Sequence, residues 1–153
     1  MDLILWRHAE AELLREGSSD AERALTAKGE RQAIKMAQWL NHRLAATTRV
    51  LVSPAERSRA TAAALGRDSR ITPCIAPAAT VEDLLKAARW PRSSEPVLLI
   101  GHQPALGQLA ALLLAGEPLE WTVKKGAVWW LRSRLRDGMD EVILQAVQSP
   151  DCL

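Results

Sequence analysis

The segment Pro96 to Ile100, PVLLI, restricts the possible folds most, because it is apolar at every position. A strand without alternating polar residues is typical of a sheet that is covered on both faces. Two other short runs, Leu3 to Trp6 and Arg49 to Val52, also have the composition of strands. Together they predict a largely parallel sheet with helices packed against it.

Helix signals separate these runs. Thr26 is a suitable N-cap for a helix with an apolar face. Ser53 is expected to cap a second helix, with proline after it and Glu56 closing a capping box. Thr80 is expected to cap a third. The apolar face of the first helix consists of Ala33, Met36, Ala37, Leu40 and Leu44. A fourth helix is expected after Gly101 to Pro104, and its apolar face consists of Leu106, Leu109, Ala110 and Leu113.

The C-terminal part of the chain has a different pattern. Ala127 to Arg132 and Val142 to Val147 are expected to be strands joined by a hairpin turn at Asp137-Gly138. A further strand is expected near Ile71 to Ile75. No linker or repeat interrupts the pattern, so residues 1–153 are expected to form one domain. The predicted fold class is α/β: three α/β/α layers with a mostly parallel central sheet and an antiparallel edge hairpin.

Composition excludes several classes of protein. The net charge of +2 is too small to indicate nucleic-acid binding, and the basic stretch Arg132 to Arg136 fits an exposed strand end. Cys74 and Cys152 lack the spacing and partners of a zinc site. No apolar run approaches the ~18 residues of a membrane helix. We therefore expect a cytoplasmic protein that does not bind nucleic acid or membranes.

Charged or reactive residues follow three of the predicted strands directly. Arg7 and His8 follow the first, Arg57 lies in the first turn after the second, and His102 follows PVLLI. Each residue alone could be a solvated surface residue. Parallel strands, however, bring their carboxyl ends to one edge of the sheet, where ligands of open α/β sheets bind.

Such a cluster is suited to a tetrahedral dianion such as phosphate. The guanidinium fork matches phosphate oxygens, and helix N-termini add N–H donors. Nearby arginines also lower the pKa of a histidine, which leaves a neutral ring nitrogen able to attack phosphorus. Two histidines without paired carboxylates form a poor zinc site, so no metal and no cofactor are expected.

These residues resemble the motifs of a known family. Arg7-His8-Ala9-Glu10 resembles the Arg-His-Gly motif of the histidine phosphatase superfamily, also called phosphoglycerate mutase-like. Leu25 to Gly29 resembles its L-T-x-x-G segment, Ser53 to Thr61 its S-P-x-x-R-x-x-x-T segment, and Gly101-His102 the motif of its second histidine. The motifs occur in the expected order. The short chain and the R-H-A-E-A start are most similar to the SixA-type phosphohistidine phosphatases.

The resemblance implies roles for five residues. His8 would be the nucleophile and would form a transient phosphohistidine. Arg7 and Arg57 would bind the phosphoryl oxygens, and His102 would donate to the transition state. Arg23 matches an arginine of SixA-type proteins that faces the phosphate, although a solvated loop cation is the alternative.

Two departures from the family pattern bear on the substrate. Ala9 stands where most members have glycine. The larger enzymes use a carboxylate as general acid, and here only Glu82 and Asp83 are candidates, both at a helix start that acids favour anyway. When its P–N bond breaks, phosphohistidine releases a neutral imidazole, which needs no general acid. A phosphate ester releases an alkoxide, which does need one. The expected partner is therefore a phosphohistidine-bearing protein, such as a histidine-containing phosphotransfer domain.

Two alternatives stay open at this point. One is a phosphatase or mutase for a small phosphate ester, with Glu82 as the acid. The other is a module that binds phosphorylated partners without turnover, although such a module does not need a nucleophile.

Overall fold

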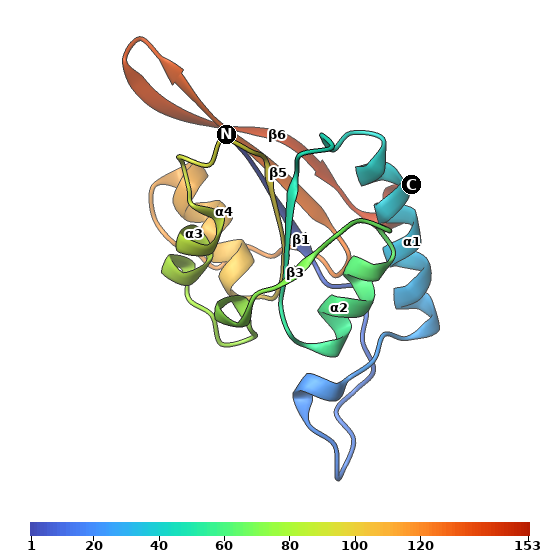
Figure 1. The fold of residues 1–153 in the computed structure, drawn as a ribbon. Helices are drawn as coiled ribbons and strands as arrows, with labels where there is room; N and C mark the ends of the chain where they lie inside the picture. The colour runs from blue at the N-terminus through green and yellow to red at the C-terminus, as the bar shows by residue number, and fades with distance from the viewer.

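The computed structural model describes all 153 residues. Six strands form one sheet in the order β3-β2-β4-β1-β5-β6 (Figure 1). No helix is both long and apolar enough to cross a bilayer. The elements are β1 Asp2–Arg7, η1 Asp20–Glu22, α1 Ala27–Asn41, β2 Arg49–Val52, α2 Glu56–Ala63, β3 Arg70–Ile71, η2 Pro73–Ile75, α3 Val81–Ala88, β4 Val97–Gly101, α4 Ala105–Ala115, β5 Val128–Arg136, β6 Met139–Gln148 and η3 Pro150–Cys152.

The sheet is mostly parallel, as predicted. β3, β2, β4 and β1 pair in parallel, and β5 and β6 add an antiparallel edge. Figure 1 shows α3 and α4 on one side of the sheet and α1 and α2 on the other. The predicted α/β/α layers and edge hairpin are therefore confirmed.

The central strands β1 and β4 are apolar along their length and are buried on both faces of the sheet. Leu3 and Leu5 of β1 pack into the cluster under α3 and α4, whereas Ile4 and Trp6 pack into the cluster under α1 and α2. All four are fully buried. Because successive side chains point to opposite faces, such a strand needs apolar residues at every position. This burial fixes the ends of β1 and β4 rigidly in the sheet.

The edge strands differ from the prediction in length. β3 ends at Ile71, so the strand predicted to reach Ile75 is wrong beyond that residue. Pro73 cannot donate to a sheet ladder, and it starts a 3-10 turn that buries Ile75 beside α3. The hairpin is longer than predicted, and its tip extends past the rest of the molecule (Figure 1). Its turn residues, Asp137 and Gly138, both have positive φ, as a two-residue hairpin of this kind requires.

Candidate active site

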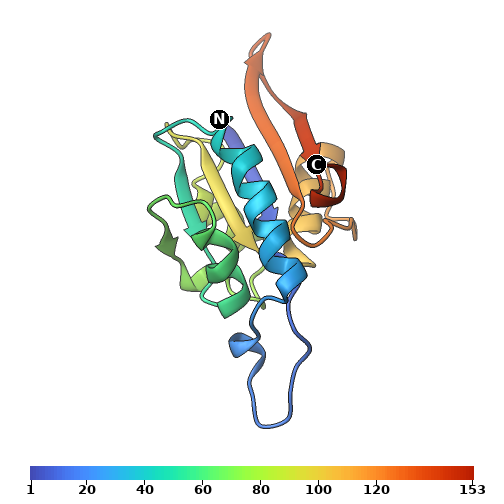
Figure 2. The ribbon, with the colours of Figure 1, turned by 90° about the vertical axis from the view of Figure 1, so that its right-hand side faces the viewer.

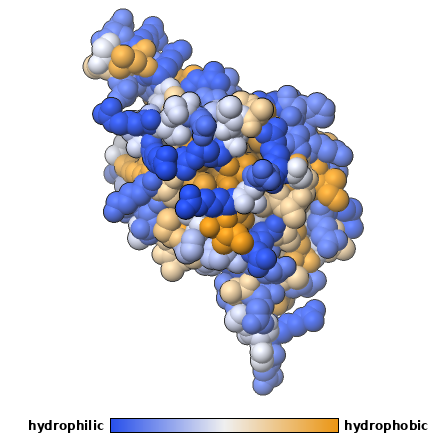
Figure 3. All heavy atoms as spheres, viewed as in Figure 1, coloured by the Kyte–Doolittle hydropathy of each residue, from blue (hydrophilic) through white to orange (hydrophobic).

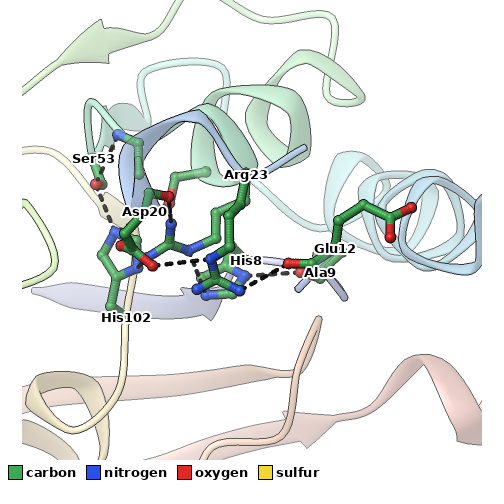
Figure 4. Close-up of polar contacts among 10 residues, drawn as sticks. His8, Ala9, Glu12, Asp20, Arg23, Ser53 and His102 are labelled. Atoms are coloured by element: carbon green, nitrogen blue, oxygen red, sulfur yellow. Dashed lines mark hydrogen bonds and ion pairs between the residues drawn. The ribbon is translucent and has the colours of Figure 1, made fainter. Parts of the chain in front are cut away.

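The structure brings the predicted histidines and Arg57 together at the carboxyl ends of β1, β2 and β4. His8 follows β1 and His102 follows β4, and the backbone N–H of His8 donates to the carbonyl of Gly101 at 3.2 Å. The two imidazole rings lie 5.2 Å apart between centroids. Arg57, the second residue of α2, reaches both rings. We refer to Arg7, His8, Arg57 and His102 as the rim (Figure 4 shows its surroundings).

Two hydrogen bonds fix the tautomer of His8. Its Nδ1 lies 2.8 Å from the carbonyl oxygen of Ala9, which can only accept, so Nδ1 carries the proton. Its Nε2 lies 3.3 Å from Nε of Arg57, which can only donate, so Nε2 has a free electron pair. His8 therefore presents an unprotonated nitrogen toward the guanidinium group of Arg57.

The surroundings keep His8 neutral. Desolvation lowers its pKa most; the hydrogen bond to Ala9 opposes this, and the charges of Arg57, Arg7 and Arg23 lower it further, to about 4. A buried imidazole among guanidinium groups is much harder to protonate than one in water. Near pH 7 the ring is thus in the state that can act as a nucleophile.

Arg57 uses its guanidinium group to connect three parts of the chain. Its Nη1 donates to the backbone carbonyl of Asp20 at 2.8 Å, and Nη2 donates to the carboxylate of the same residue at 3.1 Å. Nη2 also lies 3.4 Å from Nδ1 of His102. Because Arg57 is almost fully buried, these bonds hold the fork in one orientation.

Ser53 does not cap α2, so that prediction is wrong. The helix begins at Glu56 after Ala55, without a side-chain cap. The hydroxyl of Ser53 instead lies 2.6 Å from Nε2 of His102 (Figure 4). With Arg57 donating to Nδ1 of this ring, Nε2 carries the proton and donates to Ser53. The same hydroxyl also accepts from the backbone N–H of Ala55 at 3.3 Å, so it contacts the residue before α2 but no N–H group within the helix.

His102 is also held neutral. Desolvation lowers its pKa most, the second titrating ring, His8, and the charge of Arg57 lower it further, and the charge of Asp20 opposes them, so that the pKa is about 3. In this state Nδ1 can accept a hydrogen bond but not donate one. A phosphoryl dianion in the site would raise the pKa and favour protonation at Nδ1.

Arg7 ends β1 and is anchored on one side only. Its Nη1 donates to the carbonyl oxygen of Val123 at 2.9 Å, whereas its Nε is buried without a hydrogen-bond partner. Desolvation and then the charge of Arg57 lower the pKa of Arg7. The two cations therefore belong to one electropositive site.

Arg23 lies at the edge of the rim and is held there. Its Nε donates to the carboxylate of Asp20 at 2.9 Å, and its Nη1 donates to the carbonyl of Glu12 at 3.0 Å. Only about a quarter of its side chain is exposed, 24%. Arg23 is therefore not a freely solvated cation, and its charge contributes to the lowered pKa of His8.

Asp20 links Arg23 with Arg57, and it was not predicted from the sequence. Desolvation raises the pKa of its carboxyl group, but the hydrogen bonds and charges of Arg57 and Arg23 outweigh it, so the pKa is lowered. The available signal was its spacing of three residues before Arg23, which places both side chains on one side of the η1 turn. As an ionised carboxylate it cannot serve as a general acid.

The two carboxylates predicted as acid candidates lie outside the rim. Asp83 completes the capping box with Thr80, whose backbone N–H and hydroxyl bind its carboxylate and lower its pKa. Glu82 is exposed and lines a separate hollow with Gln108 and Pro118. Neither residue forms a hydrogen bond or an ion pair with His8, Arg57 or His102 in the described chain.

The remaining motif residues position the rim. The hydroxyl of Thr61 accepts from the N–H of Ala9 at 3.0 Å and donates to the carbonyl of Arg57 at 2.7 Å, which ties the end of β1 to α2. Ala9 is fully buried. Gly29 lies so close to the carbonyl of Glu10 that a Cβ atom would overlap it. The L-T-x-x-G segment therefore packs the start of α1 against the chain just after His8.

Comparison with known proteins gives the family. Residues 3–80 match the model of the histidine phosphatase superfamily, branch 1. This chain belongs to the histidine phosphatase superfamily. The resemblance found in its motifs is thus confirmed, and within the superfamily it extends to SixA-like proteins.

The phosphohistidine phosphatase SixA of Escherichia coli K12 is 32% identical over 126 residues, which cover 76% of each protein. An uncharacterized protein of Picosynechococcus is 32% identical over 141 residues, 87% of this chain and 86% of that protein. The structure of the protein histidine phosphatase SixA complexed with tungstate has a TM-score of 0.78 and 26% identity, with 99% of each chain covered. The likeness therefore includes the C-terminal hairpin, which lies beyond the matched family model.

Proposed function

We propose that this protein is a phosphatase that removes the phosphoryl group from phosphohistidine, through a transient phosphohistidine on His8. One observation carries the proposal: the unprotonated Nε2 of His8 faces Arg57 in a site whose only bonded carboxylate, Asp20, is ionised. The relatives named phosphohistidine phosphatase support the same substrate class.

In the first step, Nε2 of His8 attacks phosphorus opposite the leaving nitrogen. The bond between phosphorus and Nε2 forms as the P–N bond of the substrate breaks, and the substrate imidazole leaves with the electron pair. The Nδ1–H of His8, held by Ala9, supports the positive charge that develops on the ring. The cations Arg7 and Arg57 stabilise the phosphoryl oxygens in the transition state.

In the second step, water attacks the phosphorus of the phosphorylated His8. The P–N bond breaks, the electron pair returns to Nε2, and both water protons leave with the inorganic phosphate. His102 assists when the phosphoryl group raises its pKa and Nδ1 becomes a donor.

The leaving group distinguishes this substrate from a phosphate ester. A phosphohistidine whose second ring nitrogen is protonated releases a neutral imidazole. An ester releases an alkoxide, for which general acid help is worth ~10²–10⁴-fold. Asp83 is engaged in a cap, and Glu82 makes no bond to the rim, so this help is not provided by either.

The surroundings of the rim suit a phosphohistidine carried by a protein. Residues 10–24, which we call the arm, extend from the strand ends beyond the body of the molecule (Figure 2). The arm exposes two large apolar side chains, Leu13 with 85% and Leu14 with 59% of its surface. Exposed leucines beside an active site are suited to contact with a partner protein.

The decisive experiment compares substrates. A protein phosphorylated on histidine should lose its phosphate far faster than p-nitrophenyl phosphate or a sugar phosphate. Rapid acid-free quenching should trap a phosphoenzyme that is stable in alkali and labile in acid, and His8→Asn should abolish it, whereas replacing the exposed His42 should not. Turnover at the normal rate in His8→Asn would overturn the mechanism.

Replacement of the arm leucines tests the protein partner. Leu13→Ser with Leu14→Ser should lower kcat/KM for the phosphorylated protein and leave hydrolysis of free phosphohistidine unchanged. Faster hydrolysis of esters than of phosphohistidine, with loss of ester turnover in Glu82→Gln, would instead favour a small-ester enzyme.

A further inference from the structure

A second group of arginines surrounds a hollow at the β3 edge of the sheet. Arg49, Arg70 and Arg89 line a volume of about 410 Å³ whose apolar part includes Leu51 and Ile71. We call this region the arginine hollow. Figure 3 views this face of the molecule and shows hydrophilic side chains around an apolar centre. The hollow is separate from the rim, because no rim residue lines it, and Arg49 begins β2 whereas the rim lies beyond the end of that strand.

The three guanidinium groups lack partners within the protein; Arg70 and Arg89 are exposed to water, and Arg49 is half-buried. None of them takes part in the ion pairs of the chain, and none forms a side-chain hydrogen bond. Nη1 of Arg49 is buried without a partner, and no acidic residue lines the hollow. A buried donor without a partner is unfavourable, and like charges that share a hollow repel each other. An anion in the hollow would remove both costs.

We propose that the arginine hollow binds a small organic anion with an apolar part. Its carboxylate, phosphate or sulfonate group would bind to the guanidinium groups, whose planar fork fits such oxygens. Its apolar part would cover Leu51 and Ile71, because ligand sites combine mostly apolar walls with a few charged groups. A bare inorganic anion would leave that part uncovered. The proposal does not depend on the phosphatase function proposed for the rim.

Cys74 provides a reporter inside the hollow. It is exposed and lines the same volume, and the only other cysteine of the chain, Cys152, can be replaced by serine. In Cys152→Ser we would follow modification of Cys74 by the neutral reagent 4,4′-dithiodipyridine. Sodium 1-naphthalenesulfonate should slow the reaction with a saturable dependence. Sulfate should require a roughly tenfold higher concentration, since burial of a ring's apolar surface contributes at least about 1.4 kcal/mol.

Arginine variants show whether charge is responsible. Arg89 has a left-handed backbone with φ 56°, which asparagine adopts readily, so Arg89→Asn should fold normally. This variant should weaken protection by naphthalenesulfonate about three- to tenfold, the effect of one lost charge contact. Arg49→Gln should weaken it further, and Arg92→Asn, which changes an exposed arginine outside the hollow, should not. Phosphatase activity of Arg89→Asn should stay unchanged.

Several outcomes would overturn the proposal. They are absence of protection, equal protection in Arg89→Asn and Arg92→Asn, and equal protection by the uncharged analogue 1-naphthalenemethanol. Stronger protection by a glutamate-rich peptide than by naphthalenesulfonate would assign the hollow to an acidic partner protein, and would also overturn it.

Discussion

Arginine side chains gather at two places in this molecule, and their bonding differs. In the rim, Arg57 is bonded to Asp20 and directed at His8, a buried histidine with a free electron pair. In the arginine hollow, Arg49 and its neighbours have no side-chain hydrogen-bond partners in the protein, and no histidine lies among them. Cations that are already oriented can stabilise a transition state without reorganising, whereas cations without partners are suited to binding an anion. The bonding of an arginine thus says more about its role than its charge does.

The largest expected effect separates the two regions directly. Arg57→Gln should lower kcat/KM for phosphohistidine by about 10²–10³-fold, the usual loss when an oriented donor to the transition state is removed. Arg49→Gln should change kcat/KM by less than about twofold, because its side chain is remote from the reacting atoms. Steady-state kinetics of both variants test this. An equal loss in the two would remove the distinction between rim and hollow.

The second prediction concerns pH, because histidines titrate in the rim and arginines do not. The pKa values of His8 and His102 in the folded protein are about 4 and about 3, below the ordinary value of 6.5. As pH falls below 6.5, His8 and His102 bind protons in the unfolded chain but not yet in the folded chain. The free energy of unfolding therefore falls with falling pH, by up to about 1.4 kcal/mol per unit for each histidine, until the folded pKa is reached.

Urea denaturation at pH 7, 6 and 5 measures this slope. His8→Asn should reduce it, whereas substitution of the exposed His42 and Arg49→Gln should leave it as it is. An identical slope in His8→Asn and the natural chain would contradict the low pKa of His8.

The third prediction concerns Ser53, a positioning residue of the rim. Ser53→Ala removes the acceptor of the His102 Nε2–H and should lower kcat/KM about tenfold, since a misplaced ring costs orientation at the reacting centre. The ¹⁵N shifts of His102 should change from the Nε2–H tautomer to a mixture, which a purely structural role would not produce. Ser58→Ala, whose hydroxyl lies farther from the same nitrogen at 3.4 Å, is the matched control and should have a smaller effect.

The smallest expected effect concerns Asp20, the carboxylate bonded to Arg57 of the rim. Asp20→Asn removes a negative charge beside Arg23 and Arg57, so inorganic phosphate should inhibit the enzyme about threefold more strongly. Glu22→Gln, in the same turn but bonded to Ser18 rather than to an arginine, should not change inhibition. Weaker inhibition in Asp20→Asn would mean that its carboxylate serves only to orient the arginines.

Local patterns were sufficient for most of the fold. The apolar run at Pro96 to Ile100 identified a strand buried on both faces, and Asp137-Gly138 identified the hairpin turn. They failed at Ile71 to Ile75, where Pro73 and the burial of Ile75 ended a strand that the sequence pattern would have continued. Pro73 was a local signal against continuing the strand, because proline cannot donate to a sheet ladder, whereas the burial of Ile75 beside α3 depends on packing that no local pattern reveals.

The sequence by itself determined which strand ends carry His8, Arg57 and His102, because each follows an apolar run that parallel pairing brings to one edge. Only the tertiary structure decided how these groups are bonded. Ser53 is hydrogen-bonded to His102, 49 residues away in the chain, instead of capping its own helix. Asp20 is bonded to Arg57, which is 37 residues away. The physical reason is burial: a polar group removed from water must find a partner in space, and that partner is seldom a neighbour in the chain.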